Sequence, residues 1–429
     1  MKYIPINQQL YIENRKRFAK KLKPNSIAVF NSNDIMPTSA DGSMMFIQNS
    51  DIFYLSGIDQ EESILIIFPD SKEETNREVL FLKETNEHIA VWEGHKYTKE
   101  EATITSGIRK IYWMKDFFMV FNALMSEAEN VYLNTNEHLR AFIEVETRDA
   151  RFIKFCKERY PLHSYNRSAP IMHQLRAIKS KYEIDTMQQA CNITEKGFRR
   201  LLNFVKPGVK EYEIEAELIH EFVRNRSRGF AYGPIVASGA SACVLHYTDN
   251  NKECKSGDVI LLDVAAEYGN YASDLTRCLP VNGKFTSRQK DVYNAVLRVM
   301  RAAIKMLVIG NNTADYNKAV GKLMEAELIG LGLLNKDEVA KQNPAAPLYK
   351  KYFMHGTSHY LGLDVHDVGH YHRLFEAGMV FTCEPGIYIP EEGLGIRLED
   401  NILITENGPV NLMATIPIEI DEIEKLMAH

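Results

Sequence analysis

The sequence predicts two domains, an α/β domain followed by an α+β domain, and three observations lead to this expectation. A chain of 429 residues is longer than one hydrophobic core usually supports. Before about residue 165, short β-rich runs alternate with polar and helical stretches, which is typical of an α/β layer. From about Ile171, long helical patterns alternate with strand pairs. We therefore expect domains at residues 1–170 and 171–429.

The first domain is expected to hold several short strands. The β-rich runs are SIAVFNS, MMFIQNSDIFYLSGI, SILIIFP, REVLFLKE and IRKIYWM. The following segment, YPLHSYNRSAP, has two prolines and little periodicity, so we interpret it as a linker.

The second domain is expected to mix long helices with antiparallel hairpins. Residues 179–205 place apolar side chains at helical spacing, and Lys206-Pro207-Gly208 should end that helix. Further helical patterns cover residues 211–227, 288–307 and 314–332. The strand-like runs are DVILLDVAAEYG, NYASDLTRCL, MVFTCEP, GIYIP and GIRLEDNILIT.

Composition excludes several classes of partner. The chain is 45% hydrophobic and 25% charged, as in ordinary globular proteins. Its formal charge of −6 gives no electrostatic basis for binding nucleic acid or an anionic membrane. We see no signal peptide and no run of the ~20 apolar residues that a membrane span needs. Six cysteines without CxxC spacing favour reduced thiols and a cytoplasmic location.

One predicted hairpin carries two aspartates. Gly269-Asn270 favours a two-residue turn. With that turn, Asp263 lies opposite Thr276, and Asp274 lies two residues before Thr276 on the same face. The two aspartates then become diagonal neighbours, with Cβ atoms roughly 7–8 Å apart. Both carboxylates could approach one cation, although aspartates that cap turns or face solvent show the same pattern.

A second predicted hairpin carries two glutamates. The runs TCEPGIYI and GIRLEDNILI enclose a loop at residues 390–395. The midpoint of that loop places Glu384 and Glu399 opposite each other, within two positions. The carboxylates of both hairpins stand among apolar residues, where an unpaired charge costs several kcal/mol or more.

Five histidines lie just upstream, in YFMHGTSHYLGLDVHDVGHYH. His355 and His359 have the spacing of a helical zinc motif, but Gly356 replaces the glutamate of HExxH and the Gly-Thr-Ser interior disfavours a helix. His370 and His372 are best interpreted as exposed side chains.

The four carboxylates and an imidazole form an O/N donor set without thiolate. Such a set suits Mn²⁺, Co²⁺ or Zn²⁺. One ion would leave this much negative charge under-neutralised, so we expect two divalent ions about 3.5–4 Å apart.

At these residues the sequence resembles the metal-dependent pita-bread peptidases, and within them the aminopeptidase P family. The similarity covers nearly the whole chain. It is carried by FIQNSDIFYLSGI, the Trp92-Glu93-Gly94 stretch, VLHYTDN, LLDVAAEYGNYASDLTR, MHGTSHYLGLDVHDVG, EPGIYIP and GIRLEDNILIT. The resemblance implies a creatinase-type, RNase H-like N-terminal domain and a pita-bread catalytic domain built from two pseudo-symmetric halves.

The resemblance also implies a ligand set for two ions, usually manganese. Asp263 would hold one ion, His359 and Glu384 the other, and Asp274 and Glu399 would bridge them. The implied reaction releases the residue that precedes proline at the N-terminus of a peptide. A water between the ions would attack, with Glu384 as general base.

Other residues receive roles by the same resemblance. His246 and His366 would donate hydrogen bonds that polarise the carbonyl. His355, Tyr388 and Arg397 would contact substrate, although core or ion-pair roles suit the last two equally well. A further set is assigned to the rim of the site or departs from the family pattern: Asp41, Arg373, Thr357 inside HGTSH, and a shortened segment DVGHYHRLFEAGM.

Two alternatives remain open from sequence. A prolidase has the same ligands but cuts only dipeptides, and Met354 and Ser358 stand where prolidases usually have proline and glycine. A non-catalytic binding module of the same fold would have lost some of the five ligands. The family likeness also implies a homodimer or homotetramer.

Overall fold

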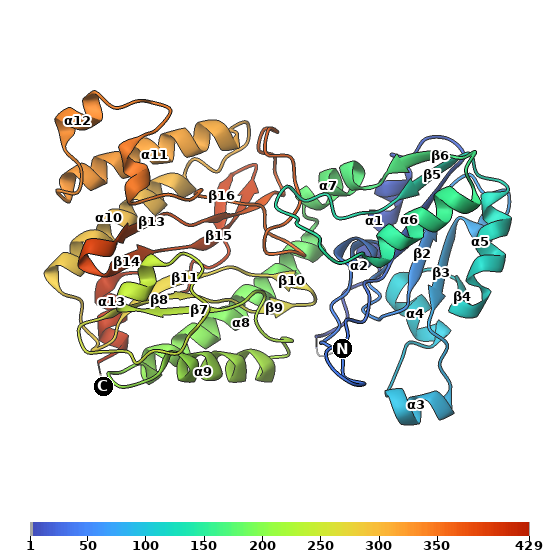
Figure 1. The fold of residues 1–429 in the computed structure, drawn as a ribbon, viewed down its shortest axis with the longest axis horizontal. Helices are drawn as coiled ribbons and strands as arrows, with labels where there is room; N and C mark the ends of the chain where they lie inside the picture. The colour runs from blue at the N-terminus through green and yellow to red at the C-terminus, as the bar shows by residue number, and fades with distance from the viewer. Residues whose placement is uncertain (1–2, 429) are drawn as a thin grey trace. The chain divides into compact units, whose positions relative to one another are not determined.

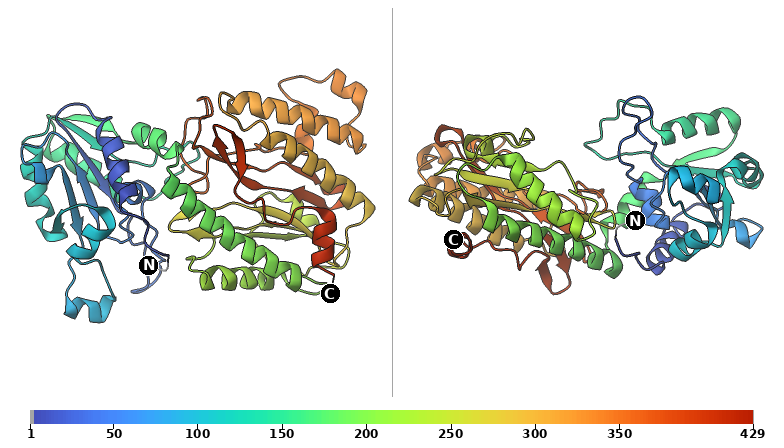
Figure 2. Two further views of the ribbon diagram at one scale, coloured as in Figure 1. Left: turned by 180° about the vertical axis from the view of Figure 1, so that it is seen from behind. Right: turned by 90° about the horizontal axis from the view of Figure 1, so that it is seen from below.

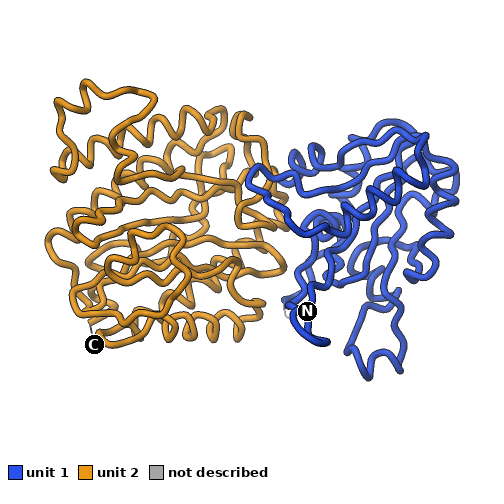
Figure 3. Tube along the Cα trace, in the orientation of Figure 1, with its two compact units in different colours: residues 1, 3–176 blue, residues 2, 177–429 orange. Residues whose placement is uncertain are grey.

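The computed structural model describes residues 3–428, which form two compact units, residues 3–176 and 177–428 (Figure 3). The first unit is α/β and the second is α+β (Figure 1). Both expected fold classes are therefore confirmed. No helix within residues 3–428 has the length and apolar character needed to cross a membrane.

The first unit is built on a six-stranded mixed sheet of order β4-β3-β2-β1-β5-β6. The pairs β1–β5, β5–β6 and β3–β4 are parallel, whereas β1–β2 and β2–β3 are antiparallel. Its strands are β1 (Ser26–Asn31), β2 (Ile64–Ile67), β3 (Glu78–Leu82), β4 (Lys110–Trp113), β5 (Asn130–Leu133) and β6 (Ser164–Arg167). Its helices are α1 (Gln9–Ala19), α2 (Ser50–Ser56), α3 (Glu87–Glu93), α4 (Lys99–Ser106), α5 (Phe117–Met125), α6 (Arg148–Arg159) and α7 (Ala169–Ala177).

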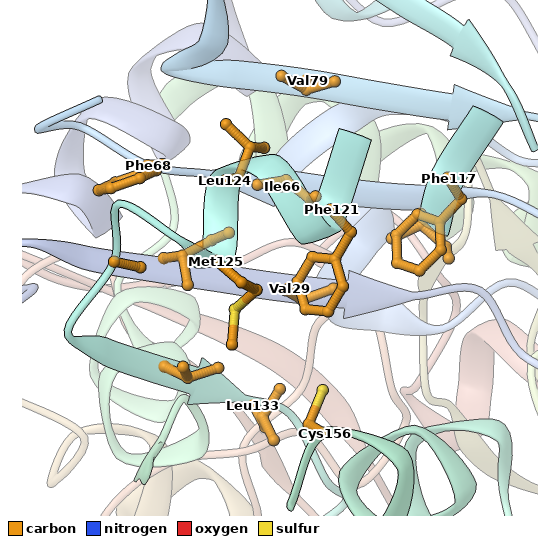
Figure 4. Packing of buried hydrophobic residues seen from close by; sticks show 14 of the residues in the cluster. Val29, Ile66, Phe68, Val79, Phe117, Phe121, Leu124, Met125, Leu133 and Cys156 are labelled. Carbon is orange, nitrogen blue, oxygen red and sulfur yellow. The ribbon is translucent and has the colours of Figure 1, made fainter. Parts of the chain in front are cut away.

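One face of this sheet packs against α5 and α6. Apolar side chains at alternate strand positions, including Val29 and Ile66, meet Phe121 and Leu124 of α5 and Cys156 of α6 (Figure 4). The period-2 alternation of the strands therefore supplies one side of the core and the helical stripe of α5 supplies the other.

Two sequence interpretations in this unit are wrong. The run MMFIQNSDIFYLSGI contains helix α2, because the Asn49 side chain caps the backbone N–H groups of Asp51 and Ile52, and Gly57 ends the helix in the left-handed conformation. The expected linker at residues 160–170 contains β6, which extends the sheet by pairing in parallel with β5. The first error thus arises from a local cap, whereas the second arises from a pairing partner distant in sequence.

The second unit holds long helices and several short antiparallel sheets, as expected. Its helices are α8 (Lys181–Phe204), α9 (Glu211–Arg224), α10 (Ser287–Ile304), α11 (Thr313–Gly330), α12 (Lys336–Ala340) and α13 (Ile420–Leu426). Its strands are β7 (Ile235–Ser238), β8 (Val259–Asp263), β9 (Glu267–Tyr268), β10 (Tyr271–Ala272), β11 (Thr276–Pro280), β12 (Val380–Cys383), β13 (Gly386–Ile389), β14 (Leu394–Arg397), β15 (Asp400–Thr405) and β16 (Gly408–Asn411).

Helix pairs flank the strands of this unit. Helix α8 begins with a capping box between Ser180 and Glu183 and ends before Lys206-Pro207-Gly208, as predicted. It packs on α9 and contacts β9 and β10, while α10 packs on α11 and contacts β12, β13 and β14. Figures 1 and 2 show the green pair α8 and α9 along one flank of the strands and the gold pair α10 and α11 along the other.

Both predicted hairpins have the expected register. Gly269 and Asn270 have positive φ values of 57° and 65°, as a type I′ turn requires, and Asp263 pairs with Thr276. In the second hairpin Gly386 pairs with Arg397, and Cys383 pairs with Asp400. Glu384 and Glu399 therefore lie directly opposite each other, between these two pairs.

A carboxyl group of the first unit is buried at the end of β1. Asp149 of α6 is 9% exposed, and the Asn31 side-chain N–H donates to its Oδ1 at 2.8 Å. Burial raises the pKa of Asp149 to about 7, against the opposing effect of the Asn31 hydrogen bond. The folded state therefore holds this proton where the unfolded chain has released it, and stability falls as pH rises between about 4 and 7.

We expect Asp149→Asn to stabilise the protein at pH 8 by roughly 2–4 kcal/mol, because the buried carboxylate is removed and the acceptor for Asn31 is kept. The gain should shrink as the pH falls to 5. Urea unfolding at both pH values measures it. Glu158→Gln, an exposed change on the same helix, is the control. An equal gain at both pH values would contradict the assignment.

Candidate metal centre

Two hairpins bring four carboxylates into the middle of the second unit. Asp263 ends β8, and Asp274 precedes β11 by two residues. Glu384 follows β12, and Glu399 lies between β14 and β15. The two hairpins meet where the Glu399 backbone N–H donates to the Thr276 carbonyl at 3.0 Å. Backbone hydrogen bonds within and between the hairpins therefore fix the backbone positions from which the acidic side chains extend.

Three of the candidate ligands form a tight group. One side-chain donor atom from each of Asp274, His359 and Glu399 lies within 4.8 Å of the others, and all three residues are buried. His359 Nε2 lies 3.4 Å from Asp274 Oδ2 and 3.7 Å from Glu384 Oε1. Glu384 thus stands beside this trio.

The His359 ring is oriented by the backbone of the next residue, Tyr360. Nδ1 lies 2.9 Å from the Tyr360 carbonyl oxygen. Since that oxygen only accepts, Nδ1 carries the hydrogen and Nε2 faces the carboxylates. Metal-binding histidines typically show this arrangement.

Asp263 is held at the other side of the cluster. Arg397 Nη2 donates to its Oδ2 and the Tyr232 hydroxyl donates to its Oδ1, each at 2.6 Å. Arg397 also donates through Nε to Thr276 Oγ1 at 3.1 Å and through Nη1 to the Tyr388 hydroxyl at 2.9 Å. The guanidinium therefore fixes the position of Asp263 by an ion pair.

The cluster carries more negative charge than the described side chains neutralise. Burial, followed by repulsion from Asp274 and Glu384, raises the pKa of Glu399 well above its ordinary value. Burial also raises the pKa of Glu384 to about 7, although His359 and Arg397 oppose the shift. Arg397 likewise opposes the burial that raises the pKa of Asp263.

These residues fit divalent metal binding. The donors are carboxylate oxygens and one imidazole nitrogen, a set that suits Mn²⁺, Co²⁺ or Zn²⁺. Burial lowers the pKa of His359, but its hydrogen bond to Asp274 and the charge of Glu384 outweigh burial and raise it. The His359 imidazole thus lies in the negative field of Asp274 and Glu384.

The other predicted histidines lie at different distances from this cluster. The His366 ring packs edge-on against the His359 ring, with centroids 4.4 Å apart. His355 Nε2 lies 2.8 Å from the Tyr388 hydroxyl, and its Nδ1 lies 3.8 Å from Glu384 Oε2. Burial, and then the charge of Arg397, lowers the pKa of His355 to about 4. His246 is exposed, and its charge also contributes to that lowering.

The residues assigned to the rim are more dispersed. Arg373 pairs with Glu376 in the segment after the histidine motif, and Asp41 is an exposed residue of the first unit. Thr357 is buried, and its carbonyl accepts the Glu384 backbone N–H at 2.9 Å. That contact uses the backbone, so it does not depend on the Thr357 side chain.

Sequence reasoning missed three side chains that support the cluster. Asn401 hydrogen-bonds both the N–H and the carbonyl of Asp274, at 3.0 and 2.6 Å. Its position in β15, two residues after Glu399 along the extended backbone, is a usable signal. The Thr276 hydroxyl donates to Glu399 Oε2 at 2.6 Å. Tyr232 lies between α9 and β7, where no local pattern points to Asp263.

Comparisons with known proteins identify both parts of the chain. Residues 185–406 match the model described as Metallopeptidase family M24. Residues 11–132 match the model described as Aminopeptidase P, N-terminal domain. The first match contains all five candidate ligands.

Individual relatives match over nearly their full length. The chain is 35% identical to a Xaa-Pro aminopeptidase of Haemophilus influenzae, covering 97% of this chain and 96% of that protein. An aminopeptidase structure from Pseudomonas aeruginosa has a TM-score of 0.89 at 32% identity, covering 100% and 99% of the two chains. A zinc-substituted Escherichia coli aminopeptidase P with product has a TM-score of 0.87 at 33% identity, covering 99% of each. The chain thus belongs to metallopeptidase family M24, with the pita-bread fold in its second unit, and is a metal-dependent aminopeptidase of that family.

Proposed function

We propose that this enzyme releases the N-terminal residue from peptides with proline in the second position. The observation that carries the proposal is the convergence of four carboxylates on His359, with Asp274, His359 and Glu399 buried. This cluster needs divalent cations and lies within a full-length match to proteins named Xaa-Pro aminopeptidase. The amide before proline has no N–H, and proline restricts the residue that precedes it. Ordinary peptidase clefts accommodate such a bond poorly, so a dedicated site is required.

In this proposal Asp263 would hold one ion, His359 and Glu384 would hold the other, and Asp274 and Glu399 would contribute ligands to both. Mn²⁺ is the proposed ion, with Co²⁺ and Zn²⁺ as alternatives that the same donors accept. When bound, the pair of ions supplies a nucleophilic water at neutral pH and polarises the scissile carbonyl.

Glu384 is the proposed general base. Its carboxylate lies at the edge of the cluster, with Oε1 near His359 and Oε2 near His355. It accepts the proton of the attacking water and returns a proton to the departing proline nitrogen, which lacks its own N–H. The half-exposed position of Glu384 allows this exchange with a bound peptide.

Histidines would stabilise the developing negative charge on the substrate oxygen. His366 lies against the ring of the candidate ligand His359, with ring centroids 4.4 Å apart, which places it next to the candidate metal centre. We propose that His366 and His246 donate hydrogen bonds to that oxygen.

The substrate side of the site would be shaped by His355, Tyr388 and Arg397. Tyr388 links the other two, since its hydroxyl contacts His355 Nε2 and accepts from Arg397. A neutral His355, consistent with its lowered pKa, presents an uncharged surface to the proline ring.

Three further features remain predictions. These are the domain boundaries at residues 1–170 and 171–429, a homodimeric or homotetrameric assembly, and a cytoplasmic location. Size-exclusion chromatography with light scattering tests the assembly directly.

We expect a chelator to abolish activity and Mn²⁺ to restore it, with close to two ions bound per chain by elemental analysis. The metal-free protein should lose stability as pH rises from about 4 to 7, because its buried carboxyl groups have raised pKa values. Mn²⁺ should remove the part of this loss that comes from the ligand carboxyl groups and leave the part that comes from Asp149. Full activity in metal-free protein would contradict the proposal.

Asp274→Asn should reduce kcat by at least about 100-fold, since even partners beyond the ligands commonly cost 10–100-fold. In the metal-free protein the same change should leave the melting temperature equal or higher, because one buried negative charge is removed. Glu406→Gln, an exposed change at the β15–β16 turn, should alter neither quantity. Retained turnover in Asp274→Asn would contradict a ligand role.

Peptide length separates the proposed activity from that of a prolidase. We expect Xaa-Pro-Yaa-Zaa and Xaa-Pro-Yaa peptides to be cleaved, with release of free Xaa measured by chromatography under defined Mn²⁺. Cleavage of the Xaa-Pro dipeptide with longer peptides left intact would reassign the enzyme as a prolidase.

A further inference from the structure

A fully buried ion pair lies next to the metal centre but outside its ligand set. Lys179 Nζ and Asp367 Oδ2 are 3.2 Å apart, and each side chain is only 1% exposed. Lys179 stands just before the N-cap of α8, and Asp367 directly follows His366. The pair therefore connects the start of α8 to the loop that carries a proposed catalytic histidine.

Stability alone is a poor explanation for this pair. Removing two charges from water costs several kcal/mol for each ion, and well-packed apolar residues of similar volume often serve as well or better. What an ion pair adds is a defined geometry, since an unpaired charge cannot remain in the interior. A buried pair beside a catalytic loop thus selects one conformation of that loop.

Close packing leaves the Asp367 carboxylate little freedom. A Cβ atom at Gly362 would lie 2.1 Å from Asp367 Oδ2 and 3.0 Å from Lys179 Cε, so glycine is required there. Asp367 Oδ1 accepts the Val368 backbone N–H, and the Asp367 backbone N–H donates to the Tyr360 carbonyl, each at 2.9 Å. The aspartate is held at both carboxylate oxygens and at its backbone.

Lys179 is anchored equally firmly. Its backbone N–H donates to the Gly378 carbonyl at 2.8 Å, and a Cβ at Gly378 would lie 3.1 Å from the Lys179 carbonyl oxygen. The ammonium group therefore projects from a fixed backbone. The backbones of Lys179 and Asp367 are therefore both held in place. The loop that carries His366 is constrained with them, because His366 directly precedes Asp367.

We infer that Lys179 and Asp367 are positioning residues that set the His366 ring against His359. The adjacent Tyr360 backbone joins the two parts, because its carbonyl accepts from both the His359 ring and the Asp367 N–H. The ion pair thus acts on the reaction through His366 and touches no substrate. The inference rests on the proposed role of His366 as a donor to the substrate oxygen.

A double-mutant cycle in the Mn²⁺-loaded enzyme tests the inference. His366→Ala should lower kcat about 100-fold, the loss typical for one oxyanion donor. Asp367→Asn should lower kcat at least about tenfold with KM within about threefold, because misplacement of a catalytic group affects the transition state most. The combination His366→Ala/Asp367→Asn should be no slower than His366→Ala alone.

The outcomes separate two failures. Losses that add in the double variant would show that Asp367 acts independently of His366, which overturns the inference and leaves the proposed function intact. An unchanged kcat in His366→Ala would overturn the role of His366 and the inference together.

Lys179→Met is a second test of the inference if Asp367→Asn folds poorly. It should lower kcat by a similar factor, and in combination with His366→Ala it should cause no further loss. The matched controls are Lys181→Met and Asp185→Asn. These two residues form an exposed ion pair on helix α8, with side-chain exposures of 83% and 61%. Both controls should keep wild-type kcat.

A crystal structure of Asp367→Asn gives a readout that does not depend on turnover. The His366 ring should leave its position 4.4 Å from the His359 ring centroid, while close to two metal ions remain bound per chain. An undisplaced His366 ring, or loss of the metal ions with the ring in place, would contradict a positioning role.

Discussion

Mutual repulsion among largely buried carboxylates is the constraint that the structure of the second unit has to satisfy. Asp263, Asp274, Glu384 and Glu399 converge, and Arg397 is the guanidinium that reaches the cluster. One positive side chain and an imidazole do not neutralise four carboxylates. The protein tolerates this arrangement because divalent cations compensate the charge, so metal binding and folding of this unit are thermodynamically linked.

Such a cluster needs a backbone that holds the acids together before the ions arrive. Arg277, a fully buried residue of β11, supplies part of this framework. Its guanidinium donates to the carbonyls of Thr276 and Glu399 and to Asp400 Oδ1, at 3.0, 2.8 and 2.6 Å. The Asn401 side chain similarly holds the backbone of Asp274 through hydrogen bonds to its N–H and its carbonyl. The two hairpins are joined by polar groups that are satisfied within the protein, and the ligands keep their positions at little further entropic cost.

Local chemistry explains which features the sequence predicted. Gly269-Asn270 defined the first turn and hence the pairing of Asp263 with Thr276, and apolar spacing with a Pro-Gly stop defined α8. The apolar residues of helix α2 suit a strand as well as a helix, so the sequence pattern predicts a strand there. The side-chain cap at Asn49 decides between the two states. Strand β6 and the contact of Tyr232 with Asp263 depend on neighbours distant in sequence. The individual roles of the ligands came from family resemblance, since spacing alone left two aspartates ambiguous.

The strand register has a consequence for how the enzyme matures. The acidic ligands lie at or within two residues of strand ends, and a slip of one residue in strand pairing would turn side chains to the opposite face. A misaligned chain would therefore present no complete cage to the cations. Metal binding therefore stabilises only those molecules whose hairpins have the correct register.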